Sequence, residues 1–112
     1  MEVGLNKIEN VTVLTIKGRA DVSSANKLEN VCKKILEKNE NNVLIDGTNL
    51  DFISSACLRV LLMLAKEIKK NAGRLAVAHL NDVVREIFEI SGFIELFPAY
   101  ENVVTGLSHF QK

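Results

Sequence analysis

Two short apolar segments, residues 43–45 and 75–78, constrain the fold of this chain more than any other feature. Each segment is apolar throughout, and each precedes a run in which apolar residues recur at helical spacing. A short strand without polar residues is typical of the centre of a parallel sheet, where helices cover both faces. We therefore predict an α/β fold with a mostly parallel sheet.

The chain before the first apolar segment predicts a hairpin and a helix. Residues 3–8 and 11–16 are extended runs separated by two residues, which favours an antiparallel hairpin. Asp21 and the two serines after it offer side-chain oxygens that can cap a helix. Apolar residues then recur at helical spacing over residues 25–36, so we predict the first helix there.

The second helix is expected after a polar loop, at a pair of serines. Residues 46–49 follow the buried strand, and residues 50–53 carry the chain onward to Ser54 and Ser55. The predicted helix over residues 55–71 is apolar nearly all round its middle. We expect it to be deeply buried or to face a partner.

The chain after the second apolar strand predicts one further strand and two helices. A helix over residues 82–90 is expected after Asn81, which can cap it, and residues 96–98 are a candidate short edge strand. A terminal helix over residues 101–110 is weakened by Gly106. The resulting order is β-β-α-β-α-β-α, with four to five strands.

Length and composition are those of an ordinary globular domain. The 112 residues suffice for one packed core, and 47% are hydrophobic and 25% charged, so we expect a single domain over residues 1–112. A formal net charge of +0 gives no field for binding nucleic acid or anionic lipid. The longest apolar run, residues 60–65, is too short to cross a bilayer, and the amino terminus resembles no leader. We expect a cytoplasmic protein without nucleic-acid or membrane partners.

The two cysteines do not predict a metal or redox site. Cys32 and Cys57 are separated by twenty-five positions, form no CxxC motif and have no histidine near them in sequence. Cys57 stands at a predicted helix start, but no histidine, asparagine or arginine cluster accompanies it as a nucleophile would require. We expect two reduced, buried thiols, no metal and no catalytic residue.

One edge of the predicted sheet gathers the polar residues that could form a site. Loops that leave the carboxyl ends of parallel strands emerge along the same edge. Asp21 follows the second strand, and a second polar group follows the third strand, so we expect hydroxyls at a helix start near several carboxylates. That second group contains Asp46, Thr48, Asn49, Asp51, Ser54 and Ser55.

Residues 43–46 and 50–61 resemble the signature of the STAS domain of bacterial anti-sigma factor antagonists. In that pattern a strand ending in Asp leads to seven positions at a helix start. They hold, in order, an aromatic residue, an aliphatic residue, either Asp or Ser, then Ser, a small residue, Gly and Leu. Residues 18–21 resemble the family's first strand-to-helix turn, and residues 84–97 resemble its third helix and exit. The resemblance covers nearly the whole chain and implies a STAS-like fold.

The resemblance implies a binding protein without catalysis or cofactor of its own, switched by phosphorylation at the start of the second helix. Unphosphorylated members bind an anti-sigma factor that is also their serine kinase, and so free a sigma factor for transcription. A serine phosphatase resets the switch. The partner supplies ATP and magnesium. We expect a monomer or weak dimer.

Two departures from the family pattern affect the choice of phosphorylated residue. Many members have Asp where this chain has Ser54, and Gly where it has Cys57; some carry the accepting hydroxyl at the position of Ala56. We expect Ser55 to be the acceptor, with Ser54 as the second candidate. The partner-binding residues implied by the resemblance and the predicted edge are Asp21, Asp46, Thr48, Asn49, Ser54, Ser55 and Arg59.

Other functions remain open. Two serines before a helix are also ordinary caps. The loss of the motif Asp and Gly favours a STAS-like scaffold or nucleotide-sensing module that is not regulated by phosphorylation. A small enzyme ranks last, because the polar group contains carboxylates and hydroxyls but no histidine to act as acid or base.

Overall fold

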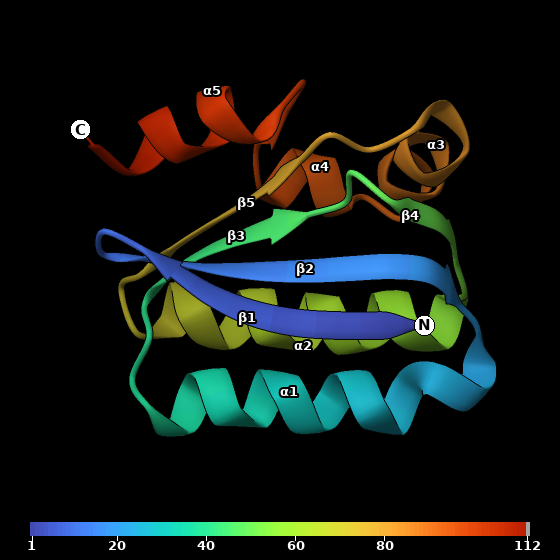
Figure 1. The fold of residues 1–112 in the computed structure, drawn as a ribbon, viewed down its shortest axis with the longest axis horizontal. Helices are drawn as coiled ribbons and strands as arrows, with labels where there is room; N and C mark the ends of the chain where they lie inside the picture. The colour runs from blue at the N-terminus through green and yellow to red at the C-terminus, as the bar shows by residue number, and fades with distance from the viewer. Residues whose placement is uncertain (112) are drawn as a thin grey trace.

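The computed structural model describes residues 1–111 and has the predicted α/β architecture, a mixed sheet with helices on both faces (Figure 1). Lys112, the last residue of the expected domain, lies outside the described residues. The strands are β1 (Glu2–Ile8), β2 (Val11–Ala20), β3 (Asn42–Asp46), β4 (Leu50–Ile53), β5 (Arg74–Ala78) and β6 (Ala99–Tyr100). The helices are α1 (Ala25–Glu37), α2 (Ser55–Lys70), α3 (Asp82–Ile90), α4 (Phe93–Leu96) and α5 (Val103–Ser108), with 3-10 turns η1 (Val22–Ser24) and η2 (His109–Gln111).

The sheet runs in the order β1-β2-β3-β5-β6, and only the β1–β2 pair is antiparallel. The predicted hairpin and the parallel centre are therefore confirmed. The remaining strand, β4, also pairs with β2, beyond the point where β3 ends. The sequence did not indicate this strand, because four residues that include Asp51 show neither a wholly apolar run nor a clean alternation.

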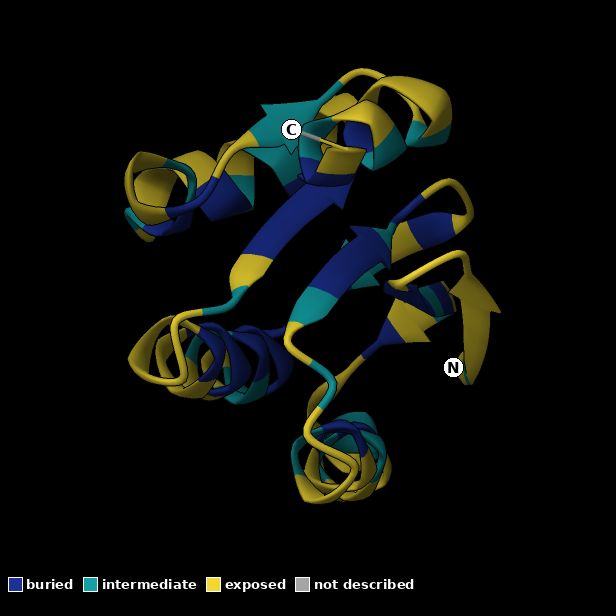
Figure 2. Cartoon of the chain, turned by 90° about the vertical axis from the view of Figure 1, so that its left-hand side faces the viewer, coloured by how far each residue is buried: buried dark blue, intermediate teal, exposed yellow. Residues whose placement is uncertain are grey.

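The larger core lies between the sheet and α1 and α2, and extends to α3 and α4. α1 and α2 run side by side along this face (Figure 1). Figure 2 shows that the central strands β3 and β5 are buried along most of their length, as their apolar sequences predict. Parallel strands of this kind need cover on both faces, which α5 and η2 supply on the opposite side.

Gly106 allows α5 to approach the sheet closely. A Cβ at this position would stand 2.9 Å from Cδ1 of Leu44 and 3.3 Å from Cβ of Ala78. The helix is shorter than predicted, because it begins at Val103 and passes into η2, where Phe110 is buried in one cluster with residues of β2, β3 and β5. The glycine that weakens the helix is thus the residue that lets it pack.

The predicted edge strand over residues 96–98 is wrong. Leu96 ends α4, and the edge strand β6 begins after Pro98. The aromatic rings explain the difference: Phe93 packs against Phe88 at a centroid distance of 4.9 Å and against Phe97 at 5.5 Å. A helical turn places Phe93 and Phe97 together in the core, whereas an extended segment would separate them.

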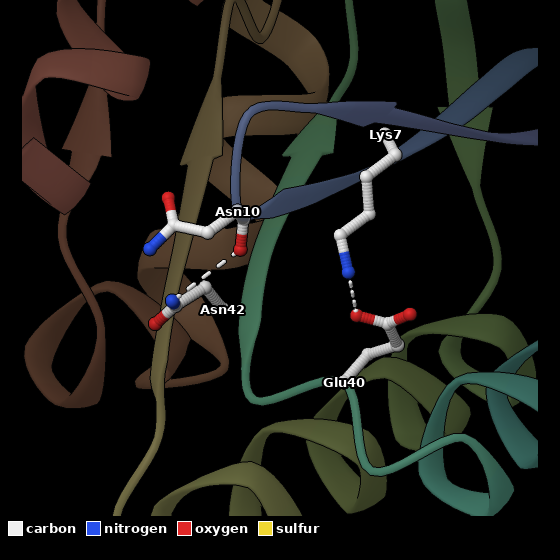
Figure 3. A network of polar contacts seen from close by, with 4 residues as sticks. All are labelled: Lys7, Asn10, Glu40 and Asn42. Atoms are coloured by element: carbon white, nitrogen blue, oxygen red, sulfur yellow. Dashed lines mark hydrogen bonds and ion pairs between the residues drawn. The ribbon is translucent and has the colours of Figure 1, made fainter.

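Polar contacts fasten the hairpin turn to the connection between α1 and β3 (Figure 3). The Lys7 ammonium forms an ion pair with the Glu40 carboxylate. The Asn42 side-chain amide donates to the carbonyl oxygen of Asn10 at 3.4 Å. These contacts lie at the end of the sheet away from the start of α2.

Both cysteines are free and buried, as predicted. Burial raises the pKa of the Cys32 thiol to about 12. Within residues 1–111, no helix has both the length and the apolar character needed to span a bilayer.

Candidate functional site

Ser54 caps α2 with a buried hydroxyl. Its Oγ accepts a hydrogen bond from the backbone N–H of Cys57 at 3.2 Å, and its own N–H donates to the carbonyl oxygen of Ala20 at 2.7 Å. Only 7% of the residue is exposed. The predicted helix start is confirmed, and the Ser54 hydroxyl is committed to holding it.

Ser55, the first residue of α2, is exposed. Its hydroxyl makes no hydrogen bond to any other described residue. Ala56 follows it and offers no hydroxyl. Of the two serines that the sequence singled out, Ser55 is therefore the one whose oxygen an enzyme or a partner can reach.

Asp21 lies beside this helix start, on the loop that follows β2. Its carbonyl oxygen accepts a hydrogen bond from the thiol of Cys57 at 3.2 Å, which joins the loop to the first turn of α2. Cys57 has no exposed surface, so its thiol has a structural position rather than that of a nucleophile. The side chain of Cys57, which stands where the resembling sequence pattern has Gly, thus packs inward.

The Asp21 carboxylate, one of the candidate caps in the sequence, does not cap the first helix. Instead, its Oδ1 accepts hydrogen bonds from the hydroxyls of Ser23 at 2.7 Å and Ser24 at 3.1 Å. These bonds hold the pKa of Asp21 below its ordinary value of 3.8, and the bond from Ser23 has the largest effect. The loop therefore presents an exposed negative charge next to the start of α2.

Asp46 and Thr48 form a separate turn at the end of β3. The Asp46 carboxylate accepts from the Thr48 backbone N–H at 3.0 Å and from its hydroxyl at 2.5 Å. Asp46 is level with Thr15 of β2, whereas Ile53, next to the serines, is level with Ala20. Five residues along a strand correspond to about 16 Å. The expected shared edge thus includes Asp21 and the serines but not Asp46 and Thr48.

Asn49 stands between the two groups. Its carbonyl oxygen accepts from the backbone N–H of Gly18 at 2.8 Å, directly before β4 begins, and its side chain is exposed. Asp51, two residues after Asn49 and within β4, is also exposed. The intervening strand β4 is what separates the Asp46 turn from the start of α2.

Comparison with known protein families identifies this architecture. The model of the STAS domain matches residues 2–106. The chain belongs to the STAS domain family. The putative anti-sigma factor antagonist BtrV of Bordetella bronchiseptica is 38% identical over 98 residues, which cover 88% of this chain and 84% of that protein.

Solved structures show the same fold at low sequence identity. A putative anti-sigma factor antagonist from Thermotoga maritima superposes with a TM-score of 0.92 at 16% identity, covering 98% of this STAS domain and 95% of that chain. The phosphorylated form of the Bacillus cell fate determinant SpoIIAA superposes with a TM-score of 0.77 at 14% identity, covering 97% and 99%. At these identities the match establishes the fold.

Two arginine side chains lie on elements at this end of the sheet. Arg59 is exposed on α2, one helical turn after Ser55. Arg19 of β2 holds its guanidinium carbon 4.6 Å from the ring centroid of Phe52, which lies on β4. This STAS domain therefore combines an accessible hydroxyl with a carboxylate and two guanidinium groups at one end of the sheet.

The sequence did not single out two valines that flank this end. Val22 on η1 is 70% exposed, and Val83 in the first turn of α3 is 59% exposed. α3 is joined to β4 through Asn81, whose side-chain amide donates to the carbonyl oxygen of Leu50 at 3.0 Å. Val22 could have been found from the sequence, because it is an apolar residue in a polar loop next to the predicted site.

The middle of α2 is less available to a partner than its sequence suggests. Leu64, in the apolar middle of α2, is 1% exposed and belongs to the core, whereas Met63 is exposed. A shallow groove of about 160 Å³ between α1 and α2 is lined by Met63 and Val60 among others. The expected extra apolar surface of α2 is thus confined to its outer side.

The chemistry of the site is that of an accessible hydroxyl. Among residues 1–111, no three His, Cys, Asp or Glu side chains are grouped to hold a metal ion. His79, at the end of β5, is exposed and makes no hydrogen bond to Ser55. The arrangement can present Ser55 to a group-transferring enzyme or to a binding partner.

Proposed function

We propose that this STAS domain is an anti-sigma factor antagonist, which binds an anti-sigma factor and so frees a sigma factor for transcription. The proposal is supported by BtrV, a relative 38% identical over 88% of the chain that carries the name putative anti-sigma factor antagonist. The domain acts by binding, and the partner contributes any catalysis.

Phosphorylation of Ser55 switches this binding off. The partner's kinase activity transfers the γ-phosphoryl group of ATP to the Ser55 hydroxyl. A bond forms between Oγ and phosphorus, the bond from phosphorus to the oxygen of the leaving ADP breaks, and the hydroxyl proton passes to a base. A serine phosphatase later hydrolyses the ester with water and restores the hydroxyl.

The observation that carries this choice of residue is the contrast between the two serines. The Ser55 hydroxyl is exposed and makes no hydrogen bond to a described residue, whereas the Ser54 oxygen is buried and caps α2. Transfer to Ser54 would first require the start of the helix to open. Ser55 can react without any change in the fold.

The fold tolerates the phosphate, but the complex does not. About −1.5 to −2 charges would be added at a helix N-terminus, where the dipole and free N–H groups favour negative charge. A partner surface that accepts a neutral hydroxyl beside the Asp21 carboxylate would meet a hydrated dianion instead. The charge of Asp46 is too distant to contribute in this way, since Asp46 on β3 is level with Thr15, which lies five residues, or about 16 Å, before Ala20 on β2.

The partner covers the end of the sheet at which α2 begins, on the right in Figure 1. Ser55 and Arg59 lie at its centre, and the exposed Val22 on η1 and Val83 on α3 contribute its apolar part. Small apolar residues around a polar centre can exclude water from a docked partner. Asp46, Thr48 and Asn49 then lie at the margin of this surface or outside it.

Isolation of the protein from its native cell, followed by mass spectrometry of the peptide with both serines, tests the proposal. We expect an anti-sigma factor in the complex and phosphate on Ser55 in the fraction that is free of it. Phosphate on Ser54 alone would contradict the choice of residue. Absence of phosphate from both serines, with the anti-sigma factor still bound, would favour a scaffold without phosphorylation, as the missing motif Asp and Gly suggest.

A further inference from the structure

We infer that Arg59 is the intramolecular partner of the phosphate on Ser55, so that phosphorylation occupies the hydroxyl and the guanidinium group together. This inference rests on the proposed function, in which Ser55 is the phosphorylated residue. It adds Arg59 to the switch as a second residue, beside the serine that accepts the phosphate.

The helix places the two side chains on one face. Both residues lie in α2, four positions apart, and both are exposed. Side chains at this spacing are neighbours, with Cβ atoms about 5–6 Å apart, and the arrangement with the acidic group first is the favourable one. A phosphate on Ser55 therefore lies within reach of the Arg59 guanidinium.

Arg59 is available for this contact. Within residues 1–111 its side chain makes neither a hydrogen bond nor an ion pair. The next cation on α2 is Lys66, eleven residues after Ser55, which corresponds to about 16 Å along a helix. Arg85 of α3, by contrast, is already paired with Glu89 at 3.0 Å.

Charged groups on the neighbouring elements do not replace Arg59. Arg19 of β2 is held over the ring of Phe52 at 4.6 Å. The nearby acidic groups, Asp21 on the loop after β2 and Asp51 on β4, repel a phosphate. Arg59 is thus the cation that shares a helix face with Ser55 and can turn toward it.

The chemistry of the pair explains how one modification can alter a whole surface. A guanidinium group can donate two parallel hydrogen bonds to a phosphate, in a geometry that an ammonium group does not match. Once bound to the phosphate, Arg59 no longer offers its positive charge to the anti-sigma factor. Phosphorylation therefore removes a hydroxyl and a cation from the docking surface.

The test uses the protein with phosphoserine placed at position 55 during translation, so that no kinase is needed. The second ionisation of the phosphate is followed by phosphorus NMR in the parent, in Arg59→Gln and in the matched control Lys66→Gln. We expect the phosphate of Arg59→Gln to titrate at a pH about 0.3 higher than in the parent, because a stabilising cation is lost. Lys66→Gln removes the same charge from the same helix and should titrate like the parent.

The conservative variant Arg59→Lys gives a second readout. Arg59→Lys should restore part of the difference, since it keeps the charge but not the paired donors. Equal titration of the parent and Arg59→Gln would overturn the assignment of Arg59. A shift in Arg59→Gln, together with no phosphate on Ser55 in the native cell, would support the pairing and overturn the proposed phosphorylation switch.

Discussion

The thiol of Cys57 donates a hydrogen bond to the carbonyl oxygen of Asp21 at 3.2 Å, across thirty-six positions of sequence. The contact joins the first turn of α2 to the loop that carries the acidic side chain of the site. Cys57 also supplies the N–H that Ser54 caps. One buried residue thus contacts both the Ser54 cap and the loop that carries Asp21.

Replacement of this thiol should destabilise the domain. Cys57→Ala removes a buried sulfur and its hydrogen bond, so we expect the free energy of unfolding to fall by about 1–2 kcal/mol. Urea denaturation measures the change. Cys57→Ser keeps a donor of similar size and should lose less stability than Cys57→Ala, and equal losses in both variants would show that the hydrogen bond contributes nothing.

The two serines should differ in their contribution to stability. Ser54→Ala deletes the cap of α2 and should cost about 1 kcal/mol of unfolding free energy. Ser55→Ala removes an exposed hydroxyl without a hydrogen bond and should change stability by less than about 0.5 kcal/mol. The reverse order in urea denaturation would mean that Ser55, rather than Ser54, holds the helix start.

Gly106→Ala should destabilise the domain although alanine is the better helix former. The added methyl group would lie 2.9 Å from the buried Leu44 side chain, and overpacking of this kind outweighs the gain in helix propensity. We expect a net loss of about 1 kcal/mol in thermal or urea denaturation. Gly4→Ala is the matched control, because nothing lies within 4 Å of a Cβ there, and it should leave stability unchanged or raised.

The charge of Asp21 should make a pH-dependent contribution to stability. Since its pKa in the folded protein is lowered, the contribution is present above the ordinary value of 3.8 and is lost as the pH falls through the lowered pKa. The difference in unfolding free energy between the parent and Asp21→Asn should therefore shrink between about pH 7 and pH 2.5. Asp51→Asn, at an exposed carboxylate without a hydrogen bond to a described residue, serves as control. A difference that is constant with pH in Asp21→Asn would contradict the role of the two serine hydroxyls.

The sequence predicted those parts of the fold that local patterns determine. The apolar runs of β3 and β5, the hairpin and the capping side chains of Ser54 and Asn81 all act over a few residues. The pairing of β4 with the far half of β2 depends on a register that no local pattern records. For that reason the sequence grouped Asp46 with the serines, although β4 separates them.

The same distinction applies to the site. A pair of serines before a helix was visible in the sequence, but the choice between them depends on which oxygen is buried. Burial also decides that Leu64 belongs to the core and that Val22 faces outward, since each depends on contacts with distant segments. The residues of a docking surface are therefore harder to predict than the helix on which they lie.

The affinity of Ser55→Asp for the anti-sigma factor, measured by calorimetry beside the parent and Ser55→Ala, tests the proposed switch most directly. We predict that Ser55→Asp keeps the far-UV circular dichroism and a thermal midpoint within a few degrees of the parent. Its dissociation constant should rise at least tenfold, or about 1.4 kcal/mol. Ser55→Ala should bind like the parent and take up no phosphate from the partner kinase. Equal affinity of Ser55→Asp and the parent, or continued phosphorylation of Ser55→Ala, would contradict the assignment of the switch to Ser55.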